Sequence, residues 1–519
     1  MRVLLYNGKI WKGNNNFVDS IGWDNSSGTI IETGNMINID KKNYKEIINL
    51  NGKLVLPSFY EGHCHLIKGS KIKKELNLRN AKTKNDFRNL INEYKKTLKA
   101  NRWIQGGYFT ETEFTENFKV DRYLLDDICR DIPIFIQRID LHSAIVNTKA
   151  IQLTEIDKQL ENFSKEEIIL GSNGELTGEL KERAMFFVYD RIPPKTTEEI
   201  CDAVEEEIKY LNSLGITSIN DVTYPEDIEI YRELLRRNRF ELDINSCLLF
   251  EQFPEYNKIS EIFSKYKKIK FNTFKAFYDG ALSSESALLW KNYKGKNHNG
   301  IKTDFVKSGE FKRLAIEIDK SGKQLMIHAI GDKAVSEVLD FAEELENING
   351  KRDRRLRIEH AQHIRPDDFQ RFIKLNVITS VQPAHLYIDA KIAIEKIIDF
   401  KNTHNYKHIS QLGGIICFGT DFPVANENPF ETIYYAMTRK VKNMDYGFIP
   451  ELSLDLNTCL LSYTYNNAYA CFEERRKGKL EAGYDADLII LNNDILKCNA
   501  SEIRDIKVEM TYFKGKRIH

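Results

Sequence analysis

Short apolar runs alternate with amphipathic stretches along most of the chain, and this alternation predicts βα units. Helical stretches such as 197–214, 309–321 and 334–346 lie between runs of strand length. The runs that qualify as strands of a parallel sheet are 54–60, 132–139, 216–221, 271–278, 324–328, 355–359, 377–381 and 415–419. Eight such units predict a (β/α)8 TIM barrel.

The two ends of the chain have a different pattern. Strand-like runs at 2–6, 20–23, 29–32 and 46–50, with turns at Asn7-Gly8 and Asn51-Gly52, predict a small antiparallel sheet. Runs at 486–491 and 507–513 offer matching strands. Because the N-terminal sheet alone is too small to be stable, we expect residues 1–55 and 475–519 to form one β-sandwich, with the barrel domain over 56–474.

Two connections between the predicted strands are longer than an ordinary βα loop. They cover 67–130, after the first strand, and about 150–195, after the second. We expect 67–130 to be an insertion within the barrel domain. It is rich in aromatic residues: Trp103, Tyr108, Phe109 and Phe114. These suit a lid over the catalytic face or the core of a separate subdomain, and both interpretations stay open.

Composition narrows the function. The 519 residues are 42% hydrophobic, which is enough for a barrel core and a smaller domain. Lys plus Arg and Asp plus Glu both number 76, so no basic excess indicates a nucleic-acid partner. No apolar run approaches the ~20 residues of a membrane span, and because the first apolar run is short we expect no signal peptide. Eight scattered cysteines without a CxxC pair favour a reducing, cytoplasmic setting.

Polar residues follow several of the predicted strands. His63 and His65 end the first run; residues two apart in a strand point to the same side, so these imidazoles would converge as they do in many metal sites. A lone His-x-His pair would equally suit an exposed loop. The ends of later runs carry further candidates: Lys275, His328, His360 and Asp421. Catalytic groups of a barrel lie at the C-terminal ends of its strands, so this placement favours a metal site.

The sequence around these residues resembles that of a known family. In chain order, the stretches that carry the resemblance are DLHSAIVN, GELTGEL, KAFYDGALSS, HAIGDKAV, RIEHAQHI, SVQPAHLYID, FGTDFPV and GKLEAGYDADLIIL. They resemble the amidohydrolase superfamily, and within it the amidohydrolase 3 branch with the YtcJ-like proteins and N-substituted formamide deformylase. The resemblance runs from about residue 50 to 495. It implies a TIM barrel with a metal centre.

The ligand set implied by the resemblance is His63, His65, Lys275, His328, His360 and Asp421. In it Lys275 would be carboxylated by carbon dioxide and bridge two metals, and Asp421 would bind metal and transfer the proton. Each has an alternative. Lys275 could remain unmodified and bind substrate at a single-metal site, His328 could be a core histidine, and Asp421 could cap a helix.

The same motifs supply the expected substrate side of the site. His142 and His385 would line the pocket, with His385 also catalytic through stabilisation of an oxyanion. Asp140, Asp279 and Glu285 complete the expected substrate-binding set. Glu285 stands where the family usually has an arginine, which favours a neutral or cationic substrate. The expected partner is a small molecule, and a homodimer is left open.

The chemistry follows from the metal. A divalent ion lowers the pKa of bound water toward ~7, so hydroxide can attack a carbonyl carbon, and Asp421 can pass the proton to the leaving amine. Zinc, as one or two ions, suits the imidazole-rich set, while iron and manganese stay open. We therefore expect a hydrolase of a non-peptide, amide-type carbon–nitrogen bond. A deaminase or a lactone or ester hydrolase would use the same residues. A non-catalytic interaction protein ranks last, because all six positions keep a competent residue.

Overall fold

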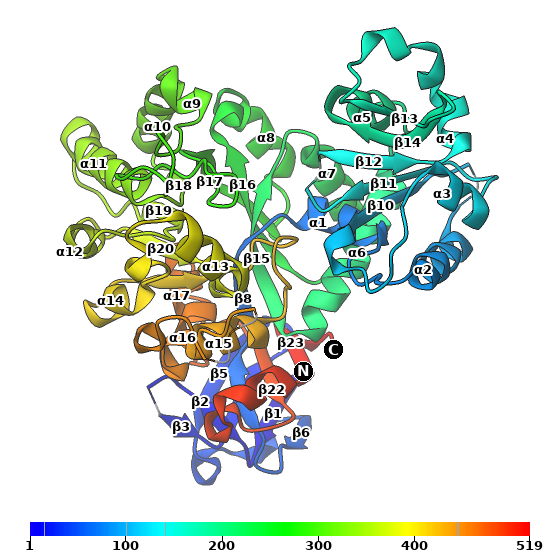
Figure 1. Cartoon of the computed structure of the whole chain (residues 1–519). Coiled ribbons are helices and arrows are strands. Elements are labelled where there is room, and N and C mark those ends of the chain that lie inside the picture. The colour runs from blue at the N-terminus through cyan, green and yellow to red at the C-terminus, as the bar shows by residue number, and fades with distance from the viewer. Residues whose placement is uncertain (15, 100, 141, 443, 445) are drawn as a thin grey trace. The chain divides into compact units, whose positions relative to one another are not determined.

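The computed structural model describes residues 1–519 except 15, 100, 141, 443 and 445. The chain forms two compact units (Figure 1). Met1–Leu66 and Glu205–His519 make up the first unit, and Ile67–Val204 the second. The expected insertion at 67–130 is thus the first part of a longer unit that also takes in the second oversized connection.

A parallel eight-stranded sheet forms the centre of the first unit. Its strands in spatial order are β8 (Phe59–Cys64), β15 (Ile216–Thr223), β16 (Asp243–Leu249), β17 (Ile269–Phe277), β18 (Gln324–Ala329), β19 (Arg357–His360), β20 (Ile378–Val381) and β21 (Ile416–Phe418). The amide of Asp421 donates to the His63 carbonyl (2.7 Å), and that of His65 to the Phe422 carbonyl (2.8 Å). These bonds join the last strand to the first, so the predicted TIM barrel is confirmed.

One predicted barrel strand was wrong. The run 132–139 contains β11 (Ile134–Arg138), which belongs to the sheet of the second unit, and the barrel uses β16 in its place. β16 escaped notice because it carries Asp243, Asn245 and Ser246 in place of an apolar run. These side chains are buried nonetheless. Asn245 Nδ2 donates to Asn220 Oδ1 (2.7 Å) and Thr273 Oγ1 (3.2 Å). These hydrogen bonds offset the desolvation cost of burying polar groups inside a barrel.

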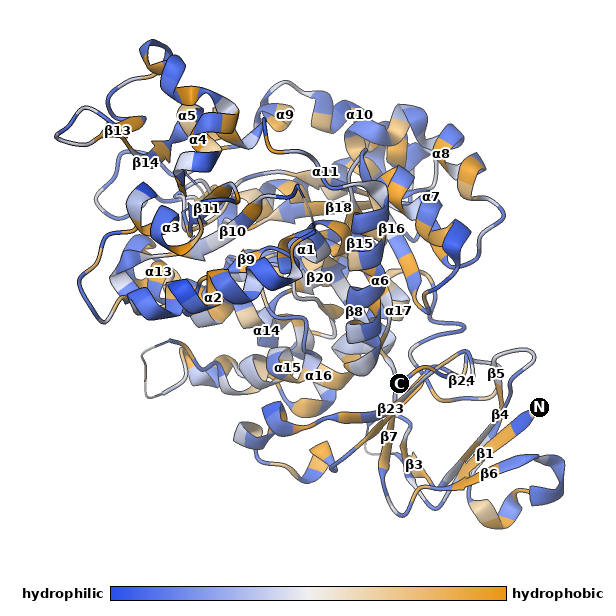
Figure 2. Cartoon of the chain, turned by 90° about the vertical axis from the view of Figure 1, so that its right-hand side faces the viewer, coloured by the Kyte–Doolittle hydropathy of each residue, from blue (hydrophilic) through white to orange (hydrophobic). Residues whose placement is uncertain are grey.

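Strands from both ends of the chain build a separate β domain, as predicted. The four-stranded sheet has the order β5 (Thr29–Gly34), β4 (Ser20–Asp24), β1 (Arg2–Tyr6), β6 (Glu46–Asn49). The six-stranded sheet has the order β24 (Lys516–Arg517), β23 (Val508–Phe513), β22 (Leu488–Leu491), β7 (Leu54–Pro57), β2 (Lys9–Trp11), β3 (Phe17–Val18). Val3, Trp23, Leu488 and Tyr512 share one core, and β1 appears as an apolar strand in Figure 2.

Two details of this β domain differ from the prediction. The run 54–60 is split, because β7 belongs to the six-stranded sheet whereas β8 begins the barrel. The N-terminal strands are not all antiparallel, since β1 pairs with β6, and β2 with β7, in parallel.

Helices connect the strands in both units (Figure 1). The described helices are α1 (Leu66–Lys73), α2 (Lys84–Thr97), α3 (Arg122–Ile128), α4 (Thr148–Thr154), α5 (Glu182–Tyr189), α6 (Thr197–Ser213), α7 (Asp227–Arg237), α8 (Tyr256–Phe263), α9 (Asp304–Lys307), α10 (Glu310–Lys320), α11 (Asp332–Asn349), α12 (Phe369–Lys374), α13 (Leu386–Lys396), α14 (Tyr406–Gln411), α15 (Pro429–Thr438), α16 (Leu456–Tyr463) and α17 (Tyr465–Ala470). Over the described residues, none of them has the length and apolar character needed to cross a bilayer.

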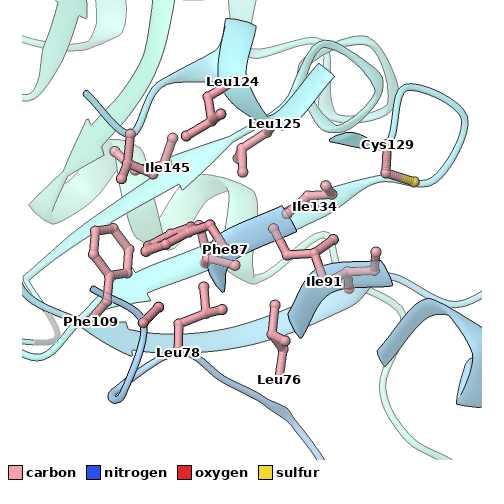
Figure 3. Close-up of a cluster of buried hydrophobic side chains, with 14 residues drawn as sticks. Leu76, Leu78, Phe87, Ile91, Phe109, Leu124, Leu125, Cys129, Ile134 and Ile145 are labelled. Atoms are coloured by element: carbon pink, nitrogen blue, oxygen red, sulfur yellow. The ribbon is translucent and has the colours of Figure 1, made fainter. Parts of the chain in front are cut away.

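The second unit has a six-stranded sheet of its own. Its order is β13 (Ile168–Leu170), β14 (Leu176–Lys181), β12 (Ser143–Val146), β11, β10 (Ile104–Phe109), β9 (Leu76–Asn77). Figure 3 shows Phe87 of α2 packed in a core with Phe109 of β10, their ring centroids 5.1 Å apart. Phe114 packs against this core, and Trp103 lies in a second one. These aromatic side chains therefore have a structural role within their own unit.

Candidate metal centre

The first histidine pair meets Asp421 where β8 and β21 close the barrel. His65 Nε2 lies 3.1 Å from Asp421 Oδ1, and His63 Nε2 lies 3.5 Å from the same oxygen. A Cβ on Gly419 would stand 2.5 Å from the His63 amide, so this close approach requires a glycine. Asp421 does not cap a helix, because Asn428 caps α15. The structure thus brings these residues together as possible ligands of one ion.

A second group shares Asp421. His360, His385 and Asp421 offer ligand atoms that all lie within 4.8 Å of one another. His360 Nδ1 is hydrogen-bonded to Gln382 Oε1 (2.7 Å), which leaves Nε2 for a metal. His360 and Asp421 have left-handed backbones (φ 72° and 56°), a conformation that is uncommon outside glycine and concentrates at functional sites. His385, expected to stabilise an oxyanion, is here also a possible ligand.

His328 and Lys275 lie beside these groups. The His328 ring is 4.5 Å from that of His360 between centroids, and its Nε2 lies 3.2 Å from the Gly280 carbonyl oxygen. Lys275 of β17 is fully buried, and its Nζ has no hydrogen-bond partner among the described residues. Burial lowers the pKa of Lys275 to about 8. Burying an amine without a hydrogen-bond partner costs free energy. Lys275 Nζ is therefore expected to interact with a group that is not part of the protein chain.

Glu359 is a site residue that the sequence analysis missed. Its Oε2 lies 2.6 Å from His63 Nδ1 and accepts from Ser380 Oγ (2.7 Å). Arg357 donates from Nε to Oε1 (2.8 Å) and from Nη2 to Oε2 (3.2 Å). A carboxylate on Nδ1 fixes the ring and directs Nε2 at the metal. The sequence feature that could have revealed Glu359 is an Arg and a Glu two residues apart in a strand predicted to be buried.

The expected substrate-binding residues are placed as follows. Asp279 is buried and accepts from the amides of Leu288 (2.8 Å), Ile330 (3.0 Å) and Gly331 (2.9 Å). These bonds organise the loop that follows His328. The structure therefore gives Asp279 a positioning role, while contact with substrate stays a prediction.

Glu285, Asp140 and His142 lie in more exposed surroundings. Glu285 Oε1 pairs with Lys396 Nζ at 3.0 Å. Asp140 and His142 belong to the second unit, where His142 is exposed and its Nδ1 lies 3.1 Å from Glu182 Oε1. Their roles toward substrate stay predictions.

The donor set fits a divalent metal. Burial lowers the pKa of His63 to about 4 and that of His328 to about 3, so both are neutral, as ligands must be, at ordinary pH. Imidazole groups together with a carboxylate are common ligands of zinc and other transition metals. Groups of this kind at the carboxyl ends of the strands occupy the place of the active site in a TIM barrel.

Comparison with known proteins identifies the family. The chain belongs to the amidohydrolase family, whose profile matches residues 46–519, and the resemblance seen in the sequence is thereby confirmed. LONG AFTER FAR-RED 3 of Arabidopsis thaliana is 29% identical, covering 100% of this chain and 91% of its own. The N-substituted formamide deformylase of Arthrobacter pascens is 23% identical, covering 91% and 89%. An uncharacterized metal-dependent hydrolase of Pyrococcus furiosus superposes with a TM-score of 0.77, at 25% identity over 96% of this chain and 100% of its own.

Proposed function

We propose that this protein hydrolyses a non-peptide, amide-type carbon–nitrogen bond of a small molecule. The observation that carries the proposal is the sharing of Asp421 between two histidine pairs at one end of the barrel. The choice of bond is supported by the relative named as a deformylase of N-substituted formamides, which contain such a bond.

The metal would be held by side chains already in place. His63, His65 and Asp421 would hold one ion, and His328 and His360 a second, which leaves His385 for the substrate. Zinc is our choice for one or both. When bound, it would lower the pKa of a water molecule toward ~7 and polarise the carbonyl group of the substrate.

The remaining steps belong to residues of this chain. Asp421 Oδ1 faces the two histidines, so Oδ2 would accept the proton of the attacking water and return it to the departing nitrogen. His385 would donate to the oxygen of the substrate. Lys275, whose amine is buried and easily deprotonated, would react with carbon dioxide to give an anionic carbamate beside the ligands.

Other features define the setting that we propose. All eight cysteines are free, which supports a reducing compartment such as the cytoplasm. The balanced charge supports a small-molecule substrate without nucleic acid. Whether the protein forms a homodimer is decided by measuring its mass in solution.

The experiment begins with metal analysis of the purified protein, followed by a panel of N-acyl amines, formamides, cyclic amides, ring amidines and lactones. We expect bound zinc and hydrolysis of amide-type members. Turnover restricted to amidines or lactones would refute the choice of bond. A protein that binds no divalent metal would refute the metal centre.

A further inference from the structure

Four polar side chains form a cluster next to the candidate metal centre: Asp389, Gln362, His363 and His404. We call it the Asp389 subsite. Asp389 Oδ2 accepts from Gln362 Nε2 (3.0 Å) and lies 3.6 Å from His404 Nε2. The second distance is too long for a hydrogen bond. None of the residues proposed above as metal ligands is a member.

The subsite adjoins the metal centre through the backbone. Asp389 lies one helical turn after His385, so their Cβ atoms are about 5–6 Å apart on one face of α13. Gln362 follows His360 by two residues, and Tyr406 donates its hydroxyl to the His360 carbonyl (3.2 Å). A small molecule at the metal centre could therefore reach Asp389 with a short extension.

The two histidines of the subsite have unused ring nitrogens. His404 Nδ1 is paired with the Tyr406 hydroxyl (3.1 Å), and His363 Nδ1 with Thr403 Oγ1 (3.2 Å). Both rings are buried, and neither Nε2 atom has a hydrogen-bond partner among the described residues. Buried polar atoms are nearly always paired, so these nitrogens indicate a ligand.

The charges of the subsite favour a cation. Asp389 pairs with no lysine or arginine in the described part of the chain. The nearby guanidinium of Arg439 donates instead to the carbonyls of Phe448, His404 and Thr403. Asp389 is 19% exposed, so a ligand can approach it from solvent. A cavity lined by His404 and Tyr406, but not by Asp389, is only about 10 Å³, which is room for a single water.

We propose that the Asp389 subsite binds a protonated amine of the substrate, a short chain away from the bond that is cleaved. Resting on the proposed function, this makes the substrate a cationic amide such as an N-acyl diamine. The ammonium group would donate to Asp389 and to the Nε2 of His404.

Binding can be tested without any turnover. Calorimetric titration of the metal-loaded protein would compare 1,3-diaminopropane with 1,3-propanediol. We expect the wild type to prefer the diamine by about tenfold or more, and Asp389→Asn to lose that preference. Glu395→Gln, an exposed change on the same helix, should retain it. Asp389→Ser serves as the second variant if Asp389→Asn does not fold. Equal binding of both probes by the wild type, or an unchanged preference in the Asp389 variant, would overturn the proposal.

Hydrolysis separates this proposal from the function on which it rests. The wild type would be offered N-acetyl-1,3-diaminopropane and N-acetyl-3-aminopropanol, and we expect a higher kcat/KM for the first. Hydrolysis of both at equal rates would refute the subsite and support the hydrolase. Hydrolysis of neither, together with diamine binding that depends on Asp389, would refute the amide-hydrolase proposal and support the subsite.

Discussion

Replacing Glu359 with glutamine tests whether this residue positions His63. The carboxylate takes part in four hydrogen bonds, two with Arg357, one with Ser380 and one with His63. A glutamine keeps the shape but turns one end into a donor, so it cannot accept all four. Loss of such an outer-shell partner typically weakens metal binding 10–100-fold, which is about 1.4–2.7 kcal/mol. The uncompensated Arg357 should destabilise the metal-free protein by about 3 kcal/mol.

The assay is a titration of zinc against a competing chelator, combined with urea unfolding of the metal-free protein. Glu474→Gln is the matched control, because Glu474 forms a two-pronged pair with Arg355 away from the metal centre. It should leave zinc affinity unchanged. A Glu359→Gln protein that binds zinc as tightly as the wild type would refute a positioning role. A control that loses zinc as well would show that the effect is a general loss of stability.

Three further predictions concern Lys275, the buried histidines and the second unit. Lys275→Ala should lose bound metal and activity, and short carboxylic acids should restore both; full metal content in the variant without added acid would contradict a bridging carbamate. The metal-free protein should be fully stable above about pH 6.5, the ordinary pKa of histidine, and should lose stability as the pH falls toward 4. The reason is that burial lowers the pKa of His63 to about 4 and of His328 to about 3; urea unfolding that is flat over this window would contradict it. Phe87→Ala should destabilise the second unit by about 3–5 kcal/mol without changing metal content, measured by local hydrogen exchange and metal analysis.

Much of the barrel was predictable, because a strand buried on both faces reads as an apolar run and polar residues mark its end. Lys275, His328 and His360 were found in this way. The same rule failed at β16, since Asn245 satisfies its hydrogen bonds with Asn220 and Thr273 from other strands. No local pattern can show partners that are distant in sequence.

The rule also failed in the opposite direction at β11, which is as apolar as a barrel strand but belongs to another sheet. The hydrophobic pattern of a strand indicates that the strand is buried, but it does not indicate to which sheet the strand belongs. Glu359 was overlooked for a related reason. Its function depends on His63, almost 300 residues earlier, and only the closed barrel brings the two side chains within 2.6 Å of each other.

The position of β7 between β2 and β22 has a consequence for synthesis. β7 is complete at Pro57, but β22 begins only at Leu488. At 5–20 residues per second, the ribosome needs roughly 20–90 s to make the intervening chain. For that time the apolar edge of β7 has no neighbour on one side, and open edges of this kind promote association between chains. Rapid folding of the barrel would shorten this exposure, and a chain that stops before β22 would keep the edge open.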